Sequence, residues 1–215
     1  MGLYPPISKT SHSACMTPLT SALCNGCAQH HLHESFFRIL VHRSTQMKLS
    51  NLSGKTVALM VASGFDEDLF IAIQRAMISV NAKLRIVSRE AGLTNAWNGS
   101  SWGMSYPADA TLSTTLAVDY DALIIPAGAK HVTTLSGDAH AKRIIGAFAR
   151  ENMPILMIGD GADMLALVDI TPPKIDDATG VGVNGPLAVA KIEAAEAGLE
   201  ALNQAMVGNG ESVAA

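Results

Sequence analysis

Hydrophobic and polar positions from Lys55 onward alternate between short aliphatic runs and longer amphipathic stretches. The runs predict strands at 56–62, 83–88, 121–126, 155–158 and, more weakly, 178–183. The amphipathic stretches predict helices at 67–81, 138–151 and 187–206, with another helix beginning near Gly161 and a hairpin or irregular segment at 97–104 around Asn98-Gly99. Strands that alternate with helices are typical of an α/β domain with three layers and a mostly parallel sheet.

The first 46 residues differ from the rest of the chain. They hold three basic residues against one acid, five of the seven histidines and all three cysteines, and they show no clear periodicity. Three explanations stay open: a disordered tail, a transit peptide, or translated sequence upstream of a start at Met47. We favour a disordered or spurious leader at 1–46, followed by a single domain at 47–215.

Composition excludes two classes of partner. The chain is 48% hydrophobic and 16% charged, its formal net charge is −4, and it contains no run of Lys or Arg. We therefore expect no nucleic acid, because such a partner requires a cationic surface. No apolar stretch approaches the ~20 residues that cross a bilayer, so no membrane partner is expected either. No cysteine follows Cys27, and we predict a cytoplasmic location.

The segment 153–165 predicts a buried strand, a sharp glycine turn and a helix, an arrangement in which α/β enzymes often carry a nucleophile. We call its turn, formed by Gly159, Asp160 and Gly161, the elbow. No Ser or Thr lies between Pro154 and Ile170. The elbow therefore has the form of an active site without a usual attacking atom, since glycine has no side chain for covalent catalysis.

Three segments together resemble a known family. They are 57–66, which ends in Ser-Gly-Phe-Asp; 121–128, which reads Asp-Ala-Leu-Ile-Ile-Pro-Ala-Gly; and 154–161, which ends at the elbow. Over about 54–168 they resemble the ThiJ/PfpI family within the class I glutamine amidotransferase-like fold. The resemblance implies a three-layer, flavodoxin-like α/β/α domain.

A closer similarity is to the C-terminal flavodoxin-like domain of large-subunit catalases. There the elbow tends to read Gly-Asp without a cysteine, and the segment 88–92, Ser-Arg-Glu-Ala-Gly, fits a turn of that domain. This chain has nothing that could supply the catalase haem pocket. The resemblance implies a stabilising or assembly role connected with catalase or with a stress response.

The same resemblance assigns site positions one by one. Active relatives such as proteases, glyoxalases and deglycases have a cysteine at the elbow, an acid after the first strand and oxyanion-stabilising glycine amides after the fourth strand. Here Gly159 takes the cysteine position, and Asp160 takes the position of its neighbouring histidine. Asp66 takes that of the acid, and Ala127 and Gly128 take those of the oxyanion glycines. The scaffold survives and the nucleophile does not.

Asp66 and Asp160 are the candidate catalytic residues that remain. They could converge as an acid/base pair, or Asp160 could act as a substitute nucleophile. The favoured alternative is that Asp160 caps the helix that follows it. His131 follows the Gly128 loop and could reach the same site, although a histidine near a helix start is more often a surface residue.

No cofactor is predicted. Gly180 to Gly185 has the spacing of a dinucleotide motif, but it lies late in the chain and lacks the acid expected about 20 residues further on. Cys24, Cys27, His30 and His33 offer soft ligands for zinc, and we favour fortuitous composition over a metal site there because no surrounding fold would orient them.

Two functional classes follow from these residues. The preferred one is a non-catalytic domain that acts in self-association, stabilisation, or binding of a ligand or protein partner, as a homodimer or larger homo-oligomer. The alternative is a noncysteine hydrolase, glyoxalase or lyase that uses Asp66 and Asp160.

Overall fold

Aliphatic runs form the centre of a seven-stranded sheet. The structure, a computed structural model, describes residues 49–211, with side chains described as far as residue 208. The strands lie in the order β6-β3-β1-β7-β8-β10-β9. Their bounds are β1 (Thr56–Val61), β3 (Lys83–Ser88), β6 (Ala110–Thr111), β7 (Ala122–Ile125), β8 (Ile155–Ile158), β9 (Val181–Asn184) and β10 (Leu187–Ala190). All neighbours pair in parallel except β9 with β10.

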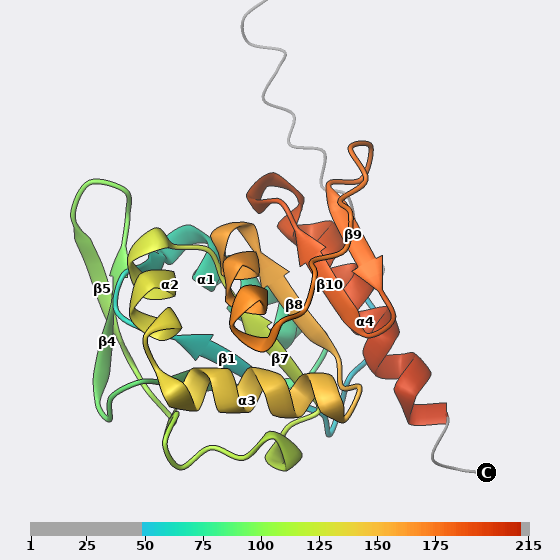
Figure 1. Cartoon of the computed structure of the whole chain (residues 1–215), viewed down its shortest axis with the longest axis horizontal. Coiled ribbons are helices and arrows are strands. Elements are labelled where there is room, and N and C mark those ends of the chain that lie inside the picture. Colours follow the sequence, from blue (N-terminus) through green and yellow to red (C-terminus); the bar gives the residue numbers. More distant parts are fainter. Residues whose placement is uncertain (1–48, 212–215) are drawn as a thin grey trace, which may run out of the picture. The chain divides into compact units, whose positions relative to one another are not determined.

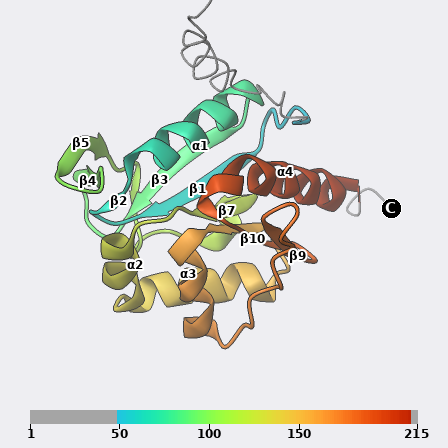
Figure 2. The same cartoon turned by 90° about the horizontal axis from the view of Figure 1, so that it is seen from above.

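Helices cover both faces of this sheet (Figures 1 and 2). Helices α1 (Glu67–Ser79) and α4 (Ala195–Glu211) pack on one face, and α2 (Ala129–Ser136), α3 (Ala139–Arg150) and the 3-10 segment η2 (Gly159–Val168) pack on the other. Because both faces are covered, every residue of β7 and β8 is buried. Within residues 49–211, no helix is both long enough and apolar enough to cross a membrane.

A small second sheet stands beside the main one. It contains β2 (Phe65–Asp66), β4 (Leu93–Trp97) and β5 (Trp102–Pro107) in the order β2-β4-β5. Strands β4 and β5 form a hairpin, seen at the left of Figure 1. The Asn98 side chain closes its turn by accepting hydrogen bonds from the amides of Ser100 (3.3 Å) and Ser101 (2.9 Å). The hairpin expected at 97–104 is confirmed, and its strands extend further on both sides.

The predicted three-layer α/β fold is confirmed. The strands expected at 56–62, 83–88, 121–126 and 155–158 and the helices at 67–81 and 138–151 are present with small changes at their ends. The segment predicted as a helix from residue 187 is wrong in its first part. Residues 187–190 form β10 instead, and after the short 3-10 turn η3 (Ile192–Ala194) the helix begins at Ala195. The weak strand expected at 178–183 is β9, at 181–184.

Helix α2 was not predicted. Its sequence contains two threonines and a valine, which are poor helix formers. In the structure the Thr133 and Thr134 hydroxyls donate to the carbonyls of Ala129 (2.7 Å) and Lys130 (3.0 Å), one turn earlier. Apolar packing of Val132 and Leu135 against the sheet holds the helix in place, so tertiary contacts override the weak propensity.

Candidate functional site

Three loops meet at the carboxyl ends of β1, β7 and β8, as the parallel sheet requires. The Asp66 amide, after β1, donates to the Ala127 carbonyl, after β7, at 3.0 Å. The Gly128 amide in turn donates to Asp160 Oδ1, after β8, at 3.1 Å. The structure thus links the predicted site residues through two hydrogen bonds between loops.

At the elbow, a side chain on Gly159 would fit only if Ile192 shifted. Its φ is +58°, in the left-handed region. A Cβ atom at this position would lie 2.9 Å from Ile192 Cγ1 and 3.0 Å from Ala127 Cβ. Ile192 comes from η3, the turn that follows β10. The direction in which an elbow nucleophile would project is therefore blocked by two apolar side chains.

Asp160 bonds to a neighbouring loop. We expected it to cap the helix that follows, but η2 has no side-chain cap and its preceding residue is Ile158. The Asp160 carboxylate accepts from the Gly128 amide instead. The Gly128 amide, which the resemblance assigns to an oxyanion site, therefore already donates to a carboxylate.

Gly128 allows the loops after β1 and β7 to approach closely. Its φ is +143°, and a Cβ atom there would lie 2.7 Å from the Gly64 carbonyl oxygen and 2.8 Å from Phe65 Cα. Both neighbours are backbone atoms, which cannot move aside as a flexible side chain can. Only glycine fits this position without displacing a loop.

The acids after β1 have structural partners. Asp66 caps α1, and its Oδ1 accepts from the Leu69 amide at 2.8 Å. Glu67 reaches the hairpin, where its Oε1 accepts from the Met104 amide (3.1 Å) and the Tyr106 hydroxyl (3.2 Å). Asp66 and Asp160 therefore bind different backbone amides, each of which would lose its acceptor if the carboxylate moved.

His131 is a buried histidine beside the site, and our expectation of a surface residue was wrong, since its exposed fraction is 0%. Its Nε2 lies 2.7 Å from the Pro126 carbonyl. A carbonyl only accepts, so Nε2 carries the proton and Nδ1 is left without a partner among the described residues. A sequence signal existed: His131 precedes Leu135 by four positions and so shares its buried helix face.

Burial lowers the pKa of His131 to about 4, and the Pro126 carbonyl and the Asp160 carboxylate oppose this effect only in part. The imidazole is therefore neutral at pH 7. Through its Nε2 the neutral histidine can hold the Pro126 loop in place. Its Nδ1 has no hydrogen-bond donor beside it among the described residues, so it has no proton to accept there.

The described residues contain no group of three His, Cys, Asp or Glu side chains that could hold a metal ion. The weak zinc candidates Cys24, Cys27, His30 and His33 lie outside the described residues, as does the predicted leader at 1–46.

Comparison with protein families gives one match: the chain belongs to the DJ-1/PfpI family, whose model matches residues 55–183. Similar solved structures include a ThiJ/PfpI domain protein from Brachyspira murdochii (17% identity, 73% of this chain and 98% of that chain, TM-score 0.62). They also include DJ-1 from Schizosaccharomyces pombe (19%, 74% and 99%, TM-score 0.59). Oxidized DJ-1 from Toxoplasma gondii is similar as well (13%, 74% and 98%, TM-score 0.57).

At such identities these likenesses establish the fold alone. No curated protein matches the chain. The narrower similarity to the catalase domain stays a prediction, as do the assigned roles of the site residues.

The blocked elbow can be tested with Gly159→Cys. Gly185→Cys is a matched control, because Gly185 has nearly the same φ (+60°) and no atom within 4 Å of its Cβ position. Both variants bear the cost of a left-handed cysteine, about 1–2 kcal/mol. Crowding by Ile192 should make Gly159→Cys less stable in urea than the control by a further 1–3 kcal/mol or so.

Adding Ile192→Ala should recover most of that difference. It should also speed alkylation of the new thiol, measured by mass spectrometry of the elbow peptide. Equal stability of the two cysteine variants would show that the elbow has room for a side chain.

His131 predicts a pH dependence of stability. An unfolded chain protonates this histidine near pH 6.5 and the folded chain only near pH 4. The unfolded state therefore binds more protons between these values, and the free energy of unfolding should fall as the pH drops from about 6.5 to about 4. At about 1.36 kcal/mol per pKa unit the loss amounts to roughly 3 kcal/mol.

Urea denaturation at several pH values should show this slope in the native chain and a flatter one in His131→Gln. His140→Gln is the control, since His140 is exposed. The explanation is wrong if the two substitutions change the slope equally.

Proposed function

We propose that this chain is a non-catalytic DJ-1/PfpI domain whose role is association, with a second copy or with another protein. The observation that carries the proposal is the elbow. Gly159 offers no attacking atom, and Ile192 and Ala127 fill the direction in which one would project. Covalent catalysis by the usual route of this fold has neither its nucleophile nor the space for one.

The oxyanion loop supports the same conclusion. Its Gly128 amide donates to Asp160. An oxyanion that formed beside this amide would have to displace the carboxylate or lie next to it, and two negative charges in contact repel each other. A site that stabilises a transition state has its donors free and aimed at the developing charge. In this chain the Gly128 amide instead stabilises the folded structure through its hydrogen bond to Asp160.

The alternative, an enzyme that uses Asp66 and Asp160, has less support. Each carboxylate binds the backbone amide of a structural element, Asp66 at the start of α1 and Asp160 at the start of α2. Each bond uses one carboxylate oxygen and leaves the second oxygen able to accept, but no hydrogen bond among the described residues joins Asp66 to Asp160 as an acid/base pair would require.

The hairpin is the surface that we propose for association. Leu93 (66% exposed), Trp102 (55%) and Met104 (68%) lie on β4 and β5 and expose large apolar side chains. Strand β5 is also the outer strand of its sheet. Exposed apolar side chains on an outer strand mark sites of protein association, and we propose a second copy as the occupant.

Absence of catalysis is tested with purified full-length protein on a panel of methylglyoxal, a peptide and an ester. We expect no turnover above the buffer rate, measured by loss of substrate. Asp66→Asn and Asp160→Asn, which keep the shape of each side chain, are the companion variants. Turnover by the native chain that either substitution abolished would establish the alternative and overturn the proposal.

Self-association is tested by sedimentation velocity over a range of protein concentrations. The double variant Trp102→Ser with Met104→Ser should raise the dimer dissociation constant at least about tenfold, because buried tryptophans dominate the binding energy of many interfaces. Val118→Ser is the control, since Val118 is as exposed (78%) but lies outside the hairpin. A native chain that is monomeric at all concentrations, or an equal effect of the control, would refute the proposed surface.

A further inference from the structure

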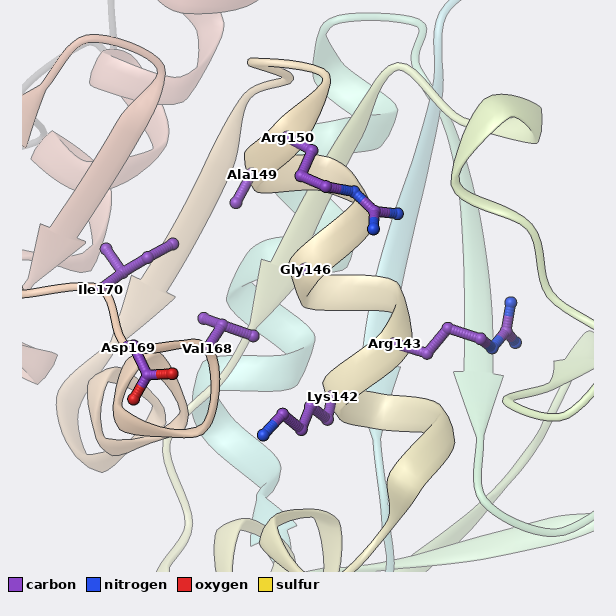
Figure 3. A pocket seen from close by; sticks show the side chains of 8 residues that line it. All are labelled: Lys142, Arg143, Gly146, Ala149, Arg150, Val168, Asp169 and Ile170. Atoms are coloured by element: carbon purple, nitrogen blue, oxygen red, sulfur yellow. The ribbon is translucent and has the colours of Figure 1, made fainter.

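A groove of about 560 Å³ lies between α3 and the end of η2 (Figure 3). Its apolar lining comes from Gly146 and Ala149 on α3 and from Val168 and Ile170 on the opposite side. The volume is in the range of sites that bind small molecules, about 300–1,000 Å³. The groove shares no lining residue with the elbow.

Gly146 opens the groove. It lies inside helix α3, where glycine is unfavourable relative to alanine by roughly 0.5–1 kcal/mol. A Cβ atom there would lie 3.6 Å from Val168 Cγ1, an ordinary contact, so packing does not require glycine. A larger residue at this position would keep the helix and extend its side chain into the groove.

The lining concentrates unpaired positive charge. Lys142, Arg143 and Arg150 line the groove against a single acid, Asp169. The four ion pairs among the described residues use none of them. In Figure 3, Lys142 extends from α3 toward Val168 and Asp169, whereas Arg143 and Arg150 leave the helix on its other side.

The Arg143 guanidinium donates to the Leu112 and Thr115 carbonyls at 2.9 and 3.0 Å. Carbonyls do not cancel its charge. The side chains of Lys142 and Arg150 have no hydrogen-bond or ion-pair partner in the described part of the chain. Excess positive charge is notable here because residues 47–215 hold eighteen acidic residues against twelve basic ones.

We propose that this groove binds a small amphipathic anion, a carboxylate or phosphate joined to an apolar body. Lys142 attracts the acidic group at one end of the groove, and the surface of Gly146, Ala149, Val168 and Ile170 contacts the apolar part. Arg150, at the other end, adds only a weaker attraction at longer range. Residues 142 and 150 are eight positions apart on one helix, about 12 Å at 1.5 Å per residue. That length suits a medium-chain acid and is short for a folded partner. The site is independent of the proposed loss of catalysis, because it uses no elbow residue.

The test is calorimetric titration of the full-length protein with octanoate. We expect a dissociation constant in the millimolar range, as befits so small a ligand. Acetate, which lacks the chain, and octanol, which lacks the charge, should each bind at least about tenfold more weakly.

Variants assign the binding to the groove. Gly146→Leu should remain folded, since leucine is a good helix former, and should lose octanoate binding. Lys142→Gln with Arg150→Gln should weaken binding about tenfold, and Asp169→Asn should strengthen it by removing the opposing charge. Arg75→Gln, at an exposed site on α1, should change nothing.

Binding that persists unchanged in a folded Gly146→Leu protein would overturn the proposal. So would equal binding of acetate, which would show charge attraction only, or of octanol, which would show apolar adsorption only. Tighter binding of an acidic peptide, lost in the same variants, would assign the groove to a protein partner and also overturn the small-ligand proposal.

Discussion

The hydrogen bond from the Gly128 amide to Asp160 holds together the two loops on which the candidate site is built. It fixes the elbow residue Asp160 to the start of α2, and the same Gly128 lies against the backbone of Gly64 and Phe65. The ends of β1, β7 and β8 are therefore in contact at Gly128. Its amide bonds to Asp160 after β8, and its lack of a side chain lets the loop after β1 approach. This junction fixes the start of α2, and the packing of Val132 and Leu135 on the sheet holds the rest of that helix.

The C-terminal part of the chain completes the enclosure of the elbow. Strand β10 pairs in parallel with β8, so the chain leaves β10 at the same edge of the sheet as the elbow. The Lys191 amide donates to the Gly180 carbonyl at 2.9 Å and directs the chain into η3. Ile192 is thereby placed against Gly159. Ile192 is 48% exposed, so its side chain covers Gly159 without being part of the buried core.

The sequence alone predicts the scaffold well and the contents of the site poorly. The period of the apolar runs is a local property, so the strands at 56–62 and 155–158 could be read directly. The missing nucleophile at Gly159 was equally visible. The contact of Ile192 with Gly159 joins residues 33 positions apart and depends on β10, whose Leu-Ala-Val-Ala sequence also suits a helix. The turn signal Asn184-Gly185 before it could have indicated a hairpin.

Active sites commonly retain strain, unpaired donors and open space, because these features serve the transition state at a cost in stability. In this chain the elbow and the Gly128 amide show none of these three features, although His131 Nδ1 beside them is buried without a partner among the described residues. Glycine adopts the left-handed elbow without strain, Asp160 pairs the oxyanion-loop amide, and Ile192 fills the space in front of it. The unused features lie elsewhere: the exposed apolar side chains of the hairpin and the unpaired cations beside Gly146. Because a fold does not by itself assign a function, the proposed association and anion binding are argued from those two surfaces, and the contacts of Gly128, Gly159 and Asp160 are argued as part of the folded structure.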